Sequence, residues 1–188
     1  MKQISVLLFV YLFFAPAFGR AQPELTSLVS APSGRSPGRP GVMDEAELQN
    51  CCKKMEKDHR RIYYLVNRGF RMNLQVKGIY IREGLLFFRL ALSNHSHLDY
   101  DVDSIRFFMK DSRATKKNAP AIHPLASLYC YGNTRLIRGK SREESVIVLQ
   151  RFTLPADKRL VIEVSEKNGG RRLQLFVDNF TLLRSRLI

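Results

Sequence analysis

The stretch L-V-I-E-V-S-E-K-N-G-G-R-R-L-Q-L-F-V-D-N-F-T-L-L-R at residues 160–184 decides the fold class. Apolar side chains alternate with other residues on both sides of a central turn, at Leu160, Ile162, Val164, Leu173, Leu175 and Val177. This period of two is typical of half-buried antiparallel strands. Between the two arms, Asn168, Gly169 and Gly170 are expected to supply the positive φ angles of a tight turn. The stretch therefore predicts a β-hairpin.

Short alternating segments separated by turn signals extend this pattern from Gly69 to the C-terminus. Gly78 interrupts one of them and is expected to mark a β-bulge. Residues 85–92 are apolar on both faces over part of their length. Several short strands with regular turns predict a mainly β domain, an antiparallel, immunoglobulin-like β-sandwich, over residues 68–188.

The first residues have the pattern of a secretory signal peptide, predicted over residues 1–21. Lys2 precedes an apolar run at residues 4–14, and small residues follow near a plausible cleavage point. A transmembrane helix needs ~20 apolar residues. Because Pro16 and Arg20 interrupt this run, we expect an exported mature chain with no transmembrane span.

Two segments separate the signal from the sandwich. Residues 22–43 are rich in Pro, Gly and Ser and predict an extended linker. Residues 44–67 have a helical period, with a capping box from Asp44 to Glu47 and basic residues largely off the apolar stripe. This amphipathic helix is expected either to lie against the sandwich or to dock on a partner or anionic surface.

Five sequence motifs in the predicted sandwich resemble the TraN family of conjugative-transposon proteins. They are G-I-Y-I-R-E-G-L-L-F-F-R-L at 78–90, N-H-S-H-L-D-Y-D-V-D-S-I-R-F-F at 94–108, Y-G-N-T-x-L-I-x-G at 131–139, F-T-L-P at 152–155 and E-K-N-G-G-R-x-L-Q-L at 166–175. The resemblance covers residues 68–188 and thus the whole predicted core.

The resemblance implies a non-enzymatic subunit of an envelope-spanning DNA-transfer apparatus of the type IV secretion class. Its partners would be other transfer subunits or further copies of itself, in the periplasm and associated with the outer membrane or an envelope complex. The alternative is an exported anion-binding adaptor that contacts DNA in transit or envelope polyanions. A secreted hydrolase is the third and weakest class.

The net charge of +14 favours anionic partners, although a solvated basic surface would show the same excess. The basic residues cluster in three predicted loops, with Lys110, Arg113, Lys116 and Lys117 in the first, Arg135, Arg138, Lys140 and Arg142 in the second, and Lys167, Arg171 and Arg172 at the hairpin. Two clusters at one end of the sandwich would form a continuous positive rim. The predicted partner-binding residues are Lys167, Arg171, Arg172, Arg135 and Arg138.

Arg171 and Arg172 are expected to face an acidic partner or another copy of the chain. Exposed charges at a turn contribute within ~0.5 kcal/mol of nothing to stability. Replacing both with alanine is therefore expected to leave the melting temperature unchanged.

Residue patterns for catalysis are not found. The four histidines belong to no hydrolase or metalloprotease motif, and the paired glycines at 169 and 170 do not lie between a strand and a helix. No enzyme activity and no cofactor are predicted.

Two smaller features leave alternatives open. His95, His97 and Asp99 alternate and could form one face of a weak metal site, but the same segment has the composition of turns that hydrogen-bond their own backbone. The three cysteines either include one disulfide, from the Cys51–Cys52 pair to Cys130, or act as small buried hydrophobes.

Overall fold

The computed structural model describes residues 43–59, 62, 64–112 and 121–188. The predicted signal peptide at 1–21 lies outside this range, as does the predicted linker at 22–43 except for its last residue. The loop residues Arg113, Lys116 and Lys117 also lie outside it.

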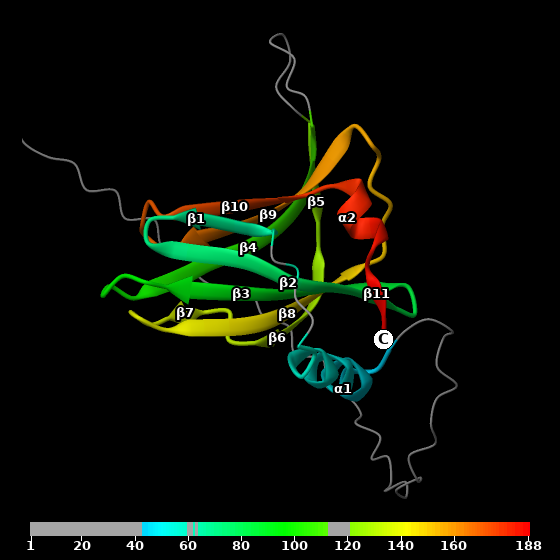
Figure 1. The fold of residues 1–188 in the computed structure, drawn as a ribbon, viewed down its shortest axis with the longest axis horizontal. Helices are drawn as coiled ribbons and strands as arrows, with labels where there is room; N and C mark the ends of the chain where they lie inside the picture. Colours follow the sequence, from blue (N-terminus) through cyan, green and yellow to red (C-terminus); the bar gives the residue numbers. More distant parts are fainter. Residues whose placement is uncertain (1–42, 60–61, 63, 113–120) are drawn as a thin grey trace, which may run out of the picture. The chain divides into compact units, whose positions relative to one another are not determined.

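In the described part of the chain, the strands form two sheets (Figure 1). The first contains β1 (Val66–Gly69), β2 (Met72–Arg82), β3 (Leu85–Asn94), β8 (Arg142–Gln150) and β6 (Ser127–Gly132) in spatial order, with β11 (Arg186–Leu187) on β2. The second contains β10 (Arg172–Val177), β9 (Lys158–Glu166), β4 (Tyr100–Asp111) and β5 (Ile122–Leu125), with β7 (Leu136–Ile137) on β4. All pairs are antiparallel except β11 with β2. The predicted antiparallel β-sandwich preceded by one helix is confirmed.

The predicted hairpin is formed by β9 and β10. Leu160 pairs with Val177, Ile162 with Leu175 and Val164 with Leu173. All six side chains are buried in the core between the two sheets. The alternation in the sequence thus identifies the inward face of both strands correctly.

The turn of the hairpin differs from its prediction. Asn168 has a φ of 54°, whereas neither Gly169 nor Gly170 has a positive φ. Asparagine adopts this left-handed conformation more readily than most residues. At Gly169 an added Cβ would lie 2.1 Å from Oε2 of Glu166, so a side chain there would displace the carboxylate that pairs with Arg171. The positive φ expected at Gly169 and Gly170 is therefore wrong, and Gly170 also has open space around it.

The predicted bulge in β2 is confirmed. The register against β3 shifts between Val76 and Gly78. The extra residue, Lys77, allows Val76 and Ile79 both to pack into the core between the sheets. Lys77 itself is buried outside this core, where it pairs with Glu144.

Helix α1 (Glu45–Glu56) is shorter than the predicted helix at 44–67. It begins as expected, because the Asp44 side chain accepts a hydrogen bond from the Glu47 amide at 2.7 Å. After the helix, the Ile62 amide donates to the Lys77 carbonyl at 3.0 Å, and β1 begins at Val66. Ile62 and the start of β1 therefore pair with β2 instead of continuing the helix, since backbone pairing outweighs the helical period of the sequence.

The second core explains why β3 is apolar on both faces. Helix α1 covers the outer face of the first sheet and buries a cluster made of Met43, Cys51, Cys52, Met55, Tyr80, Leu85, Phe87, Val146 and Val148. Of the two expectations for the helix, the structure supports packing against the sandwich. Neither described helix is long and apolar enough to cross a membrane.

The cysteines form no disulfide in this fold. Cys51 and Cys52 lie on the buried face of α1, and Cys130 is exposed on β6. Burial raises the pKa of the Cys52 thiol to about 12, with smaller contributions from Cys51 and Glu56. Cys52 thus acts as a small buried hydrophobe.

A buried ion network fastens α1 to the sheet. The Glu144 carboxylate on β8 accepts hydrogen bonds from Lys77 at 2.5 Å and from Arg89 at 2.8 Å. Arg89 also donates to the carbonyl oxygens of Glu56 at 2.9 Å and of Asp58 at 2.6 Å. Because carbonyl groups at the end of a helix lack partners within it, Arg89 caps α1 from the sheet.

Candidate partner-binding surface

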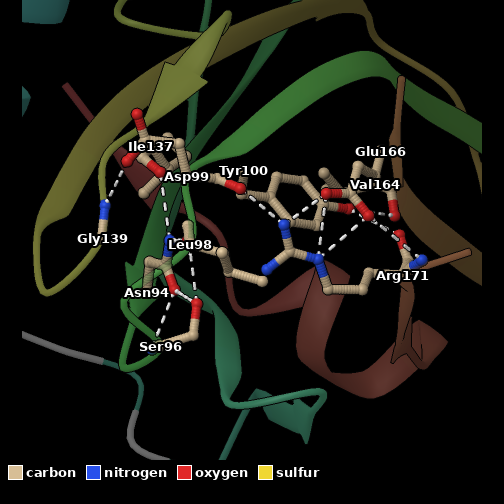
Figure 2. Close-up of polar contacts among 10 residues, drawn as sticks. All are labelled: Asn94, Ser96, Leu98, Asp99, Tyr100, Ile137, Gly139, Val164, Glu166 and Arg171. Atoms are coloured by element: carbon tan, nitrogen blue, oxygen red, sulfur yellow. Dashed lines mark hydrogen bonds and ion pairs between the residues drawn. The ribbon is translucent and has the colours of Figure 1, made fainter. Parts of the chain in front are cut away.

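The loop between β3 and β4 is organised by Asn94, which is buried (Figure 2). Its side-chain oxygen accepts hydrogen bonds from the Ser96 amide at 3.0 Å and the Ser96 hydroxyl at 2.7 Å. Its amide donates to the carbonyls of Leu98 at 2.7 Å and Ile137 at 3.2 Å. One side chain thus satisfies the backbone of its own loop and joins it to β7.

This arrangement agrees with the turn interpretation of the N-H-S-H-L-D segment. The ring of His95 contacts the Asn73 amide at 2.9 Å, and Asp99 accepts a hydrogen bond from the Gly139 amide at 2.7 Å. Across the described residues, no group of three or more His, Cys, Asp or Glu side chains is placed to hold a metal ion.

The loop between β6 and β8 lies directly against this first loop. The Lys140 amide donates to the Ser96 carbonyl at 2.9 Å, and the Lys140 ammonium donates to the His95 carbonyl at 2.9 Å. At Gly139, an added Cβ would lie 2.5 Å from the carbonyl oxygen of His97. The backbones therefore approach each other more closely than any side chain at residue 139 would allow.

The hairpin between β9 and β10 completes this end of the sandwich. The Lys167 amide donates to the Asp101 carbonyl at 2.8 Å. Tyr100 is fully buried, and its hydroxyl donates to the Arg171 carbonyl at 2.9 Å. Burial raises the pKa of Tyr100 to about 12, and the charge of Glu166 adds to the shift.

Arg171 is held inside the chain. Its guanidinium pairs with Glu166, donates to the Asp99 carbonyl at 2.6 Å and lies 4.9 Å from the centroid of the Tyr100 ring (Figure 2). Its side chain is only 18% exposed. The hydrogen bond from Arg171 holds the pKa of Glu166 below its ordinary value. Most of the donors that a partner would need are therefore already used.

The structure brings two of the three predicted basic clusters together. Both the 133–141 loop and the hairpin contact residues 99–102, through Gly139 and Arg135 on one side and Lys167 and Arg171 on the other. The basic rim at this end consists of Arg135, Arg138, Lys140 and Lys167, all exposed. None of these four has an ion-pair partner among the described residues. The four positive charges of the rim thus outnumber the two negative charges of the exposed aspartates beside it, Asp99 and Asp101.

Two predicted cations lie away from the rim. Lys110 is ten residues beyond Tyr100 along β4, a distance of about 33 Å in an extended strand. Arg172 lies on β10, with its side chain 61% exposed and its Nε 4.0 Å from Glu163. Arg172 therefore belongs to the face of the second sheet, which is a different surface from the end of the sandwich.

Arg171→Ala is expected to lower stability by about 2 kcal/mol, because it removes charge-assisted hydrogen bonds and leaves Glu166 unpaired. For a domain of this size, that corresponds to a fall in melting temperature of roughly 4–8 °C. Arg172→Ala is the matched control and should change the melting temperature little, since its side chain is mostly exposed. Equal melting temperatures for the two variants, measured by circular dichroism, would contradict the structural role of Arg171.

The fold and this surface define a helix-covered antiparallel β-sandwich that presents basic loops at one end. The chain belongs to the family described as a domain of unknown function, DUF4138, which matches residues 45–187. The match runs from the start of α1 into β11 and so includes the first core, the second core except Met43, and the rim. No match to a curated protein was found.

Proposed function

We propose that this protein is a TraN-like structural subunit of an envelope-spanning apparatus for conjugative DNA transfer, of the type IV secretion class. The motifs that resemble TraN at 94–108, 131–139 and 166–175 supply the three loops that meet at the basic rim. That convergence is the observation that carries the proposal. Proteins commonly present partner-binding residues on loops that a rigid scaffold and hydrogen bonds hold in place.

The rim is the proposed contact surface for other transfer subunits or for a further copy of the chain. Arg135, Arg138 and Lys167 present charges that no described carboxylate neutralises. Charge complementarity of this kind selects acidic partners and speeds their association. The proposed location is the periplasm, in a complex associated with the outer membrane.

Replacing Arg135, Arg138 and Lys167 together with alanine is expected to abolish co-purification with transfer subunits from detergent-solubilised envelopes. Transfer efficiency should fall at least tenfold, while the melting temperature stays unchanged because these side chains are exposed. The matched control removes the same charge from the exposed side of α1 and its C-cap, by alanine at Lys53, Lys54 and Lys57. Equal partner recovery from both variants would refute the role of the rim.

The anion-binding adaptor is the second candidate, and the excess of cations over carboxylates at the rim favours it. In that case the purified protein binds DNA or heparin with an affinity that falls steeply with salt, since binding releases counterions. Stoichiometric protein partners that persist at moderate salt support the assembly function instead.

A further inference from the structure

A concave surface, separate from the rim, lies on the outer face of the β10-β9-β4-β5 sheet. It is a groove of about 610 Å³ to which all four strands contribute, with Arg106, Lys110, Ile122, Val161, Glu163 and Arg172 among its lining residues. Neither described helix contributes a lining residue. The outer face of the other sheet, in contrast, is covered by α1.

The side of the groove near the hairpin is cationic. Arg106 on β4 pairs with the buried carboxylate of Glu163 on β9, and Arg172 on β10 lies 4.0 Å from the same carboxylate. Glu163 also accepts a hydrogen bond from Gln174 at 2.6 Å. Burial alone would raise the pKa of Glu163, but the bonds from Gln174 and Arg106 outweigh it and lower the pKa. The carboxylate is thus ionised and already occupied.

Glu163 therefore orients two guanidinium groups while neutralising only one of them. The Arg106 and Arg172 side chains remain 58% and 61% exposed. Each guanidinium has five N–H donors, and Glu163 engages only part of them. Lys110 lies four residues after Arg106 on the same face of β4 and adds a third positive charge.

The side of the groove near β5 is apolar. Val161 is buried at its base, and Ile122, Pro124 and Leu125 come from β5. Ile122 is 58% exposed, which is unusual for a large aliphatic side chain that serves only the core. Lys110 lies opposite Ile122 in the register of β4 and β5, so this apolar strip has a cation beside it in addition to the two arginines near the hairpin.

We infer that this groove binds an extended polypeptide segment that carries carboxylate side chains beside an apolar one. The carboxylates would pair with Arg106 and Arg172, which can each form bidentate hydrogen bonds, and the apolar side chain would cover Ile122 and Val161. Four strands span about 14 Å, which corresponds to roughly four residues of an extended chain crossing them. That the segment belongs to a transfer subunit rests on the proposed function. The acidic and apolar character of the segment rests only on the residues of the groove.

A polypeptide fits these residues better than a nucleic acid. A nucleic-acid strand presents phosphates at regular intervals and stacks its bases on aromatic rings. Here Phe107 is buried in the core, so Phe108 is the one ring of the lining that a base could reach, and Ile122 and Pro124 beside it are not aromatic. An acidic peptide can place an apolar residue there, whereas a phosphate backbone cannot.

The test measures binding of a fluorescent peptide, Glu-Glu-Leu-Val-Glu-Glu, to the full chain by fluorescence anisotropy. The double variant Arg106→Gln, Arg172→Gln keeps hydrogen-bonding groups near Glu163 but removes both charges, and it should weaken binding at least tenfold. The matched control, Lys53→Gln with Lys54→Gln on the exposed side of α1, removes the same charge outside both the rim and the groove and should leave the affinity within twofold. A lysine version of the peptide should not bind.

A second variant distinguishes a loss of binding from misfolding of the first variant. Ile122→Ser changes only an exposed side chain. It should weaken binding of the Leu-Val peptide about fivefold and leave binding of a peptide of six glutamates unchanged. Unchanged affinity in both groove variants would overturn the inference. So would a single-stranded oligonucleotide of equal charge that competes more strongly than the peptide, because it would assign the groove to nucleic acid.

The outcome is separable from that of the proposed function. A groove that binds the acidic peptide, in a protein that recovers no transfer subunits, refutes the assembly proposal and leaves the inference standing. The opposite outcome refutes the groove inference alone. In that case the unaltered protein recovers transfer subunits, the rim variant does not, and the acidic peptide does not bind the unaltered protein.

Discussion

A chain that begins at Arg68, without α1, is expected to fail to fold. The deletion removes Cys51, Cys52 and Met55 from the second core, which exposes Phe87 and its neighbours to water, and it also removes Leu65 from the first core. Each large apolar side chain contributes about 1.5–3 kcal/mol when buried. Because whole domains are stable by only about 5–15 kcal/mol, this loss consumes most or all of the stability.

The control for this truncation begins at Met43 and keeps α1 intact. It should give a cooperative thermal transition and a β-rich far-UV spectrum, whereas the shorter chain should show neither. A folded, monomeric chain from Arg68 onward would show instead that the sandwich is independent of the helix, as a docking helix requires.

Glu144→Ala is expected to destabilise the protein by about 3 kcal/mol, because it leaves two buried cations without their carboxylate. The Lys77 and Arg89 side chains are 4% and 7% exposed, so water cannot replace the lost partner well. Urea unfolding measures this loss as a lower midpoint with an unchanged slope. The matched control is Glu143→Ala on the same strand, for which no described ion pair exists. Similar midpoints for the two variants would contradict the network.

The same network makes stability depend on pH. Burial alone would raise the pKa of Glu144, but hydrogen bonds from Lys77 and Arg89 outweigh it and hold the pKa below the ordinary 4.5. A carboxyl group with a lowered pKa in the folded state stabilises the fold above its unfolded pKa. This contribution is therefore complete above about pH 4.5 and is lost as the pH falls through the lowered value. Glu144→Ala should flatten this part of the profile.

Local patterns were sufficient for most of the strands. The alternation at Leu160, Ile162 and Val164 identifies the buried face of β9, because successive side chains of a strand point to opposite faces whatever the strand contacts. The bulge at Gly78 and the cap at Asp44 were predictable for a similar reason. The cap depends on Glu47, three positions from Asp44, and the bulge was indicated by Gly78 itself, next to the extra residue Lys77.

The end of α1 was not predictable in this way. Residues 57–67 keep a helical period, yet Ile62 and Val66 pair with β2. Nothing within the segment itself indicates that a strand edge is available to it. Backbone pairing with a distant strand overrides a local preference worth only tenths of a kcal/mol per residue.

For the candidate site, the sequence by itself determined that basic residues lie in loops and at the hairpin, because turn residues and charges are local features. Tertiary structure alone decided which of them are available. Arg171 and Arg172 are adjacent and chemically identical, yet one is held by Asp99, 72 positions away, and the other faces a groove. Neighbouring residues point to opposite sides of the chain, so their surroundings come from different strands. The grouping of Arg135, Arg138 and Lys167 likewise arises only because two distant loops bind the same segment, residues 99–102.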